Sequence, residues 1–122
     1  MKLSKSKMTD IKIKRDIIKF SSLFDKKSFS PIRSGNISNR YILNGNEGFL
    51  ITPSGKKNSE IKIKDLVFVS MDGVIKKNQK PSSEWRFHLD LYRSTNCTSV
   101  VHAHSKFAVI CSCLYKKIPP FH

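Results

Sequence analysis

The feature that most constrains the fold is a change of hydrophobic period along the chain. A helical repeat comes first, with apolar residues spaced by four, three and four positions: Ile13, Ile17, Phe20 and Phe24. This spacing predicts one face of an amphipathic helix. Thr9 can cap that helix with Asp10 in its first turn, which leaves residues 1–8 as a basic tail. One domain is therefore expected over residues 9–122.

Short apolar runs bounded by Gly, Asn, Pro and Ser follow the helical repeat. Their length and composition predict strands over four segments: 39–43, 48–52, 66–70 and 98–104. Asn44-Gly45-Asn46 predicts a hairpin turn between the first two strands, and Asp72-Gly73 predicts a second hairpin that leads into Val74-Ile75. The β-branched, apolar character of 98–104 indicates a buried strand.

Two further helices are expected. One follows the turn at Pro81-Ser82-Ser83 and has four large residues on one face: Trp85, His88, Leu91 and Tyr92. The other covers 107–114, before Pro119-Pro120. The order helix, strands, helix, strand, helix indicates an α/β or α+β domain.

Composition excludes several classes of protein. The 122 residues suit one domain, and no apolar run approaches the length of a membrane span or a secretory signal. Three cysteines without a signal do not make a disulfide framework, so a cytoplasmic location is expected. The charge of +14 comes from lysines scattered over the chain without interleaved aromatic residues. It indicates a solvated surface rather than specific nucleic-acid binding.

The sharpest chemical signal is Val101-His102-Ala103-His104. Residues i and i+2 of a strand point to the same side, so His102 and His104 could bind one metal ion. Taken alone, the pair is better explained as a half-buried sheet edge. Glu84 is a candidate metal ligand or general acid/base, although a carboxylate at a helix start is also favourable in itself.

Three Gly- and Ser-containing turns could hold an anion: Ser34-Gly35-Asn36, Thr52-Pro53-Ser54-Gly55 and Ser82-Ser83. Taken singly, each is more often an ordinary turn. Cys111 and Cys113 could complete a zinc site with the histidines, but two helical residues at i and i+2 diverge, so we expect both cysteines to be buried. His88 is expected to be a packed core histidine.

The order of these motifs identifies a resemblance. The series runs Ser34-Gly35-Asn36-Ile37-Ser38, Ile51-Thr52-Pro53-Ser54-Gly55, Asp65-Leu66-Val67, Met71-Asp72-Gly73, Pro81-Ser82-Ser83-Glu84, Val100-Val101-His102-Ala103-His104-Ser105 and Ile118-Pro119. It resembles the class II aldolase/adducin head domain family from about residue 10 onward. The resemblance implies a central, mostly antiparallel sheet flanked by helices, and a homo-oligomer, a tetramer in known members.

The resemblance also implies a site. His102 and His104 match two of three histidines that bind a divalent metal, usually Zn²⁺, and Glu84 matches the carboxylate that ligates the resting metal and then acts as acid/base. Six residues match the positions that bind the substrate phosphate: Gly35, Asn36, Ser54, Gly55, Ser82 and Ser83. The implied reaction is metal-dependent cleavage of a carbon–carbon bond in a sugar phosphate, with the metal stabilising the enediolate. Epimerisation and dehydration are alternatives that the family also supports.

The chain departs from the family pattern after Ile118-Pro119, because the third metal histidine and the C-terminal part of the sheet lie beyond His122. We therefore expect an amino-terminal fragment that binds metal weakly, or has lost it, and turns over little alone. His122 is not expected to replace the missing ligand. The alternatives are a non-catalytic interaction module, half of a split enzyme with a separately encoded C-terminal half, and, least favoured, a basic nucleic-acid-binding protein.

Overall fold

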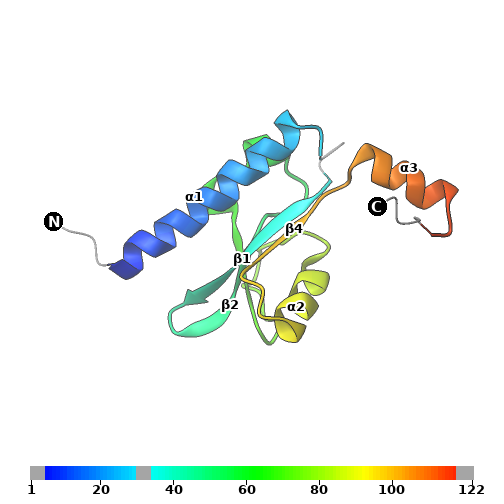
Figure 1. Cartoon of the computed structure of the whole chain (residues 1–122). Coiled ribbons are helices and arrows are strands. Elements are labelled where there is room, and N and C mark those ends of the chain that lie inside the picture. The colour runs from blue at the N-terminus through cyan, green and yellow to red at the C-terminus, as the bar shows by residue number, and fades with distance from the viewer. Residues whose placement is uncertain (1–4, 30–33, 118–122) are drawn as a thin grey trace.

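The computed structural model describes residues 5–29 and 34–117, without the side chains of residues 5–8. Seven helices and strands and two short 3₁₀ turns, η2 and η3, follow one another: α1 (Lys5–Lys26), β1 (Asn36–Leu43), β2 (Asn46–Ile51), η2 (Asn58–Glu60), η3 (Ile63–Asp65), β3 (Val67–Ser70), α2 (Trp85–Ser94), β4 (Ser99–His102) and α3 (Lys106–Leu114). Figure 1 shows α1 and α2 on opposite sides of the strands. The predicted element order is confirmed.

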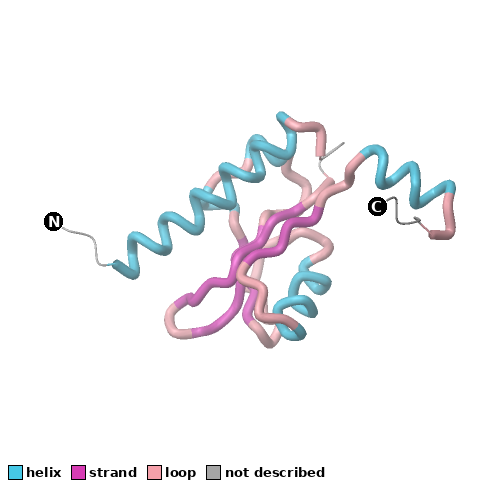
Figure 2. The backbone as a smooth tube through the Cα atoms, viewed as in Figure 1, coloured by secondary structure: helices cyan, strands magenta, loops and turns pink. Residues whose placement is uncertain are grey.

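The strands form one antiparallel sheet in the order β3-β2-β1-β4. Leu43 pairs with Asn46, so the β1–β2 hairpin has a two-residue loop. Asn44 and Gly45 both have positive φ in that loop, 52° and 84°, as a type I′ turn requires. After α2 the chain returns to the far side of β1 as β4 (Figure 2). The fold class expected from the resemblance is thereby confirmed.

Alternation along the strands sends side chains into two cores. On one face, Ile17 and Phe24 of α1 pack with residues that include Ile37, Tyr41 and Leu50. On the other face, Leu89 and Tyr92 of α2 join a cluster of strand residues: Phe49, Ile51, Val67, Val69 and Val100. Neighbouring residues of one strand face opposite sides, so a two-residue period fills both cores.

Arg40 of β1 fixes the C-terminal end of α2 against the sheet. Its guanidinium donates to the carbonyl oxygen of Cys97 at 2.7 Å, to that of Thr95 at 2.9 Å and to that of Tyr92. A cation suits the negative end of a helix, where carbonyl groups lack partners within the helix. The N-terminal end of α2 is thereby set at the opposite end of the sheet, beside Asn36.

Several predicted boundaries and burials are wrong. The first helix begins at Lys5 rather than after Thr9, so the helix extends into the predicted tail. The first strand begins at Asn36, because β4 pairs with it there. The second hairpin reduces to one isolated bridge, Val69 to Ile75. The predicted buried strand is the edge strand β4, and Val101 is 61% exposed on its open face.

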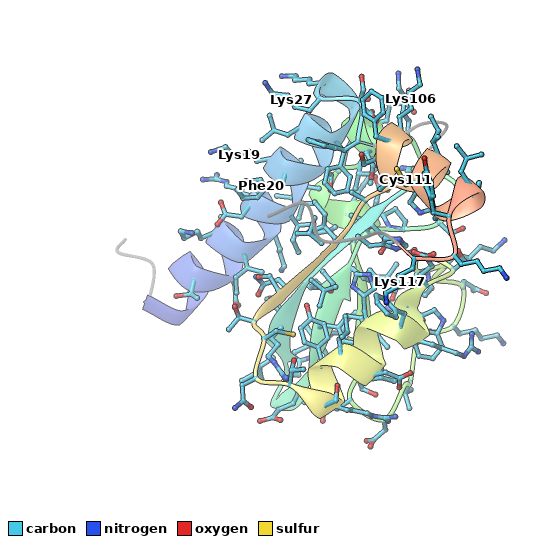
Figure 3. All side chains as sticks on the ribbon, turned by 45° about the vertical axis from the view of Figure 1, so that its right-hand side comes forward. Lys19, Phe20, Lys27, Lys106, Cys111 and Lys117 are labelled. Carbon is cyan, nitrogen blue, oxygen red and sulfur yellow. The ribbon has the colours of Figure 1, made fainter. Side chains whose placement is uncertain are left out.

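The prediction that Cys111 and Cys113 are buried is also wrong. Both lie on α3, where none of the helical residues is buried, and Cys113 is exposed. The helix leads away from the sheet after β4, and Figure 3 shows Cys111 on its ribbon. The described residues offer α3 no surface to pack against.

No helix in the described ranges is long and apolar enough to cross a bilayer. The turn at Ser30-Pro31, the Pro119-Pro120 stop and His122 fall outside the described residues.

Candidate functional site

The two histidines of the His-x-His motif lie at the end of β4 and face the same side. His102 pairs with Asn36 across the β1–β4 ladder, and the His102 and His104 ring centroids are 4.7 Å apart. The backbone N–H of His104 donates to the carbonyl oxygen of Phe29, which holds the end of the strand in place. The prediction that the side chains of residues i and i+2 point to the same side is confirmed for His102 and His104.

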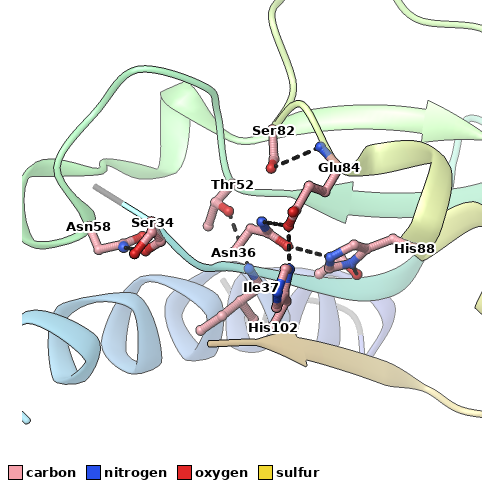
Figure 4. Close-up of polar contacts among 10 residues, drawn as sticks. Ser34, Asn36, Ile37, Thr52, Asn58, Ser82, Glu84, His88 and His102 are labelled. Carbon is pink, nitrogen blue, oxygen red and sulfur yellow. Dashed lines mark hydrogen bonds and ion pairs between the residues drawn. The ribbon is translucent and has the colours of Figure 1, made fainter. Parts of the chain in front are cut away.

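Glu84 turns toward these histidines and away from its own helix. It occupies the N-cap position of α2, yet its side chain makes no capping hydrogen bond. Its Oε2 accepts a 2.8 Å hydrogen bond from the side-chain amide of Asn36 and contacts Nδ1 of His102 (Figure 4). A carboxylate that served only to stabilise the helix start would face the free N–H groups of the first turn.

The donor set fits a divalent cation. One ligand atom from each of Glu84, His102 and His104 can be chosen so that all three lie within 4.8 Å of one another. Nδ1 of His102 is buried and makes no hydrogen bond within the described residues, although it touches the carboxylate. A buried ring nitrogen whose neighbour is a carboxylate oxygen is placed to share a cation with it. Two imidazoles and a carboxylate are a typical catalytic zinc set. No other such cluster, and none containing Cys111 or Cys113, occurs in the described part of the chain.

The electrostatics of the site keep Glu84 ionised. Burial raises the pKa of the Glu84 carboxyl, but the hydrogen bond from Asn36 and the charges of His102 and His104 outweigh it and hold the pKa below its ordinary value. An ionised carboxylate is the form that binds a metal or accepts a proton.

All six residues matched to the phosphate position line one cavity of about 210 Å³, together with Glu84 and His104. Gly35 shows why its position needs glycine: its φ is +81°, and a Cβ there would lie 2.9 Å from the carbonyl oxygen of His102. Three turns that are separate in sequence therefore meet beside the three candidate ligands. We call this cavity the anion cavity.

Backbone bonds fix the turns around the anion cavity. The N–H of Ser54 donates to the carbonyl oxygen of Lys80, and the N–H of Ser82 donates to that of Thr52, each at 3.0 Å. Since these N–H groups are already bonded, Ser54 and Ser82 would address an anion through their hydroxyls. An adjoining hollow of about 290 Å³ shares Pro53 and Ser54 with the cavity. Its charged lining residues are Lys56, Lys64, Lys80 and Asp65, and Asp65 pairs with Lys56 at 2.7 Å.

Sequence reasoning missed a buried polar chain behind the site. The Ser38 hydroxyl lies 2.6 Å from Nδ1 of His88 and 2.7 Å from the Tyr92 hydroxyl, while Nε2 of His88 bonds Oδ1 of Asn36. The prediction of a core histidine is confirmed, because His88 is fully buried. Burial lowers the pKa of His88 to about 4 and raises that of Tyr92 to about 12. The available signal was the four-residue spacing of Glu84, His88 and Tyr92, which puts them along one helix face.

A larger hollow on the described surface lies away from these groups. It measures about 690 Å³ and lies between the start of α1 and the β1–β2 hairpin, where Thr9, Ile13 and Gly45 are among its lining residues. None of the candidate site residues lines it. We place the candidate site at the smaller cavity because the ligating side chains converge there.

Comparisons with known proteins agree with this geometry. The chain is 41% identical over 90 residues to the 5-methylthioribulose-1-phosphate/5-deoxyribulose-1-phosphate aldolase of Rhodospirillum rubrum, a match covering 73% of this chain and 39% of that protein. It is 40% identical over 90 residues to the L-fuculose phosphate aldolase of Haemophilus influenzae, with 73% and 40% covered.

Solved structures give the same result. The L-fuculose-1-phosphate aldolase of Thermus thermophilus superposes with a TM-score of 0.75 at 28% identity, over 90% of this chain and 55% of that one. The chain thus spans about half the length of its relatives or somewhat less. The profile of the family described as "Class II Aldolase and Adducin N-terminal domain" matches residues 15–122. On this match and on the fold, the chain belongs to the class II aldolase and adducin N-terminal domain family.

Proposed function

We propose that this chain binds a divalent metal, zinc in the first instance, and the phosphate of a ketose 1-phosphate, as part of a class II aldolase that cleaves a carbon–carbon bond. One observation carries the proposal: the anion cavity is lined by Glu84 and His104 together with all six phosphate candidates. One relative and one solved structure that are named as sugar 1-phosphate aldolases support the substrate class.

The anion cavity would position the substrate by its phosphate. Ser54, Ser82 and Ser83 would donate hydroxyl hydrogen bonds, and Gly35, with its positive φ, would shape the first turn around the phosphate. The lysines of the adjoining hollow add positive potential that attracts a dianion. With its phosphate so held, the sugar chain would extend toward Glu84 and His104.

Cleavage of a ketose 1-phosphate breaks the bond between C3 and C4. The C4 hydroxyl loses its proton and becomes an aldehyde, and the electron pair left on C3 is delocalised into the C2 carbonyl. C3 then takes a proton, and Glu84, ionised at rest, is the described residue placed to accept the proton of the C4 hydroxyl and return it to C3. A divalent cation held by Glu84, His102 and His104 would supply Lewis-acid polarisation of the substrate oxygens.

Metal titration tests the first half of the proposal. Calorimetry with Zn²⁺, and absorption spectroscopy with Co²⁺, should show saturable binding of about one ion per chain. Glu84→Gln and His104→Gln should weaken that binding at least tenfold, since each removes a ligand. Glu60→Gln is the matched control, because Glu60 is exposed and outside the site. Equal affinities for Glu84→Gln and Glu60→Gln would contradict the proposal.

Phosphate binding and turnover test the second half. Nuclear magnetic resonance titration with inorganic phosphate should shift the backbone amides of Gly35, Gly55 and Ser83, and Ser54→Asp should abolish the shifts through charge repulsion. Ser112→Asp on α3 adds the same charge at an exposed position outside the cavity. We expect this chain alone to cleave ketose 1-phosphates slowly. The release of dihydroxyacetone phosphate measures the rate. Failure of phosphate to shift the cavity amides would refute the assignment.

A further inference from the structure

A continuous chain of hydrogen bonds links the core to the candidate metal ligand. It runs from the Tyr92 hydroxyl to Ser38, from Ser38 to His88, from His88 to the Asn36 amide, and from Asn36 to Glu84. Figure 4 shows its last part, with Asn36 between the His88 ring and the Glu84 carboxylate. Two elements and the residue before α2 contribute: β1 supplies Asn36 and Ser38, α2 supplies His88 and Tyr92, and Glu84 precedes α2.

The donors and acceptors in this series of hydrogen bonds have only one consistent order. An ionised carboxylate can only accept, so the Asn36 atom that faces Glu84 is its NH₂ group. Oδ1 of Asn36 therefore faces His88, and Nε2 of His88 must carry the proton. A neutral imidazole then has Nδ1 free to accept from the Ser38 hydroxyl, which in turn accepts from Tyr92.

Burial prevents exchange of these partners with water. Ser38 and His88 are fully buried and Tyr92 is 2% exposed. The Asn36 side chain alone could break the order, because a 180° turn of its amide exchanges oxygen for nitrogen at both ends. That turn would point the carbonyl oxygen at the Glu84 carboxylate and the NH₂ group at the Nε2–H of His88. Both contacts would be repulsive, so the Nε2–H of His88 and the Glu84 carboxylate together lock the orientation of the amide.

We propose that His88 is a positioning residue: through its Nε2–H it fixes the Asn36 amide, and the amide holds the Glu84 carboxylate in the place from which it ligates the metal. The inference rests on the proposed function for its metal, although the hydrogen-bond order itself does not. Partners of metal ligands commonly change metal affinity by about 10–100-fold when they are removed.

The central experiment compares His88→Leu with His88→Gln in the full chain. Leucine removes the donor and frees the amide, and we expect Zn²⁺ affinity, measured by competition with a chelating dye, to fall about tenfold. Glutamine can place an N–H donor near the position of Nε2 and should restore affinity to within about threefold of the natural protein. The Asn36 side-chain amide protons should exchange at least tenfold faster in His88→Leu than in the natural protein, and His88→Gln should not show this increase.

Tyr92→Phe separates positioning from a merely structural role. It breaks the far end of the chain and keeps Ser38, His88 and Asn36 in order, so it should lower stability and leave metal affinity within about threefold. If affinity follows the melting temperature across all three variants, the role is structural and the inference is overturned. Equal loss in folded His88→Leu and His88→Gln would overturn it as well.

A measurement on the natural protein decides the inference even where a variant does not fold. Nitrogen-15 spectra should show His88 neutral with its proton on Nε2, and a proton on Nδ1 would refute the order. If the natural protein binds no metal, the proposed function fails on that result. The His88 tautomer and the Asn36 amide exchange still decide whether His88 fixes the amide.

Discussion

Helices α2 and α3 are close in length, ten and nine residues, but only one of them is part of a core. α2 carries three charged side chains, Arg86, Asp90 and Arg93, yet it buries His88, Leu89 and Tyr92 against the sheet. α3 is far more apolar and buries nothing: Phe107 is 75% exposed and Leu114 is 70% exposed. Apolar content therefore does not decide burial within the described residues. A helix is buried when its apolar stripe meets a surface that the fold presents.

The two helices also differ in what they contribute to the candidate site. The buried face of α2 carries the polar chain that ends at Glu84, so packing of α2 and geometry of the site depend on each other. α3 follows His104 directly but shares no residue with the anion cavity. Substitutions on the two helices should therefore differ sharply in their effects.

The largest expected effect is that of Leu89→Ala. Leu89 is 5% exposed in the core between α2 and the sheet. Truncation leaves a cavity, and we expect the free energy of unfolding to drop by about 2–5 kcal/mol. Urea denaturation followed by circular dichroism measures it. A loss below about 1 kcal/mol would mean that α2 is not packed as described.

The pH dependence of stability is the next largest effect. The pKa of His88 is about 4 in the folded chain because of burial, against an ordinary value of 6.5. Between these values the unfolded chain binds a proton that the folded chain does not, so stability falls as the pH drops from 6.5 toward 4. The shift corresponds to roughly 3 kcal/mol at 1.36 kcal/mol per unit.

The control for this effect is His88→Gln, which has no titrating ring. Denaturation curves at pH 7, 6, 5 and 4 should show a smaller loss of stability for this variant. The difference between the two proteins isolates His88 from the other titrating groups. Parallel curves would show that His88 does not stay neutral in the folded chain.

Tyr92→Phe should have a smaller effect. The substitution keeps the ring in the core and removes the hydroxyl that bonds Ser38 at 2.7 Å. Loss of one buried hydrogen bond should lower the free energy of unfolding by about 0.5–1.5 kcal/mol. Thermal denaturation at neutral pH measures this difference, and unchanged stability would remove Tyr92 from the polar chain.

Leu114→Ala on α3 should have the smallest effect and is the matched control for Leu89→Ala. Leu114 is 70% exposed, so truncation removes little buried area and stability should change by less than about 0.5 kcal/mol. Urea denaturation under the same conditions checks it. A loss comparable to that of Leu89→Ala would show that α3 packs on a partner in solution and would remove the contrast between the helices.

Local patterns in the sequence predicted the elements and the sides to which their residues point. The helical spacing from Ile13 to Phe24 and the His102–His104 alternation involve neighbours along the chain. The structure agrees with both, except that Phe20 is 50% exposed. The six phosphate candidates came from a resemblance, since each turn taken alone was consistent with an ordinary loop. The structure brings them to one cavity, and their roles stay predictions.

What the sequence by itself determined is therefore the element order, the two-faced alternation and the pairing of two imidazoles. Among the described residues, tertiary structure alone decided that β4 is an edge, that α3 is uncovered, and that Ser38 meets His88 and Tyr92 across separations of 50 and 54 residues. The physical reason is the distance along the sequence over which each kind of interaction acts. Dihedral preferences and side-chain period act over a few neighbouring residues. Burial and hydrogen-bond partners depend on which distant surfaces the strand register brings together.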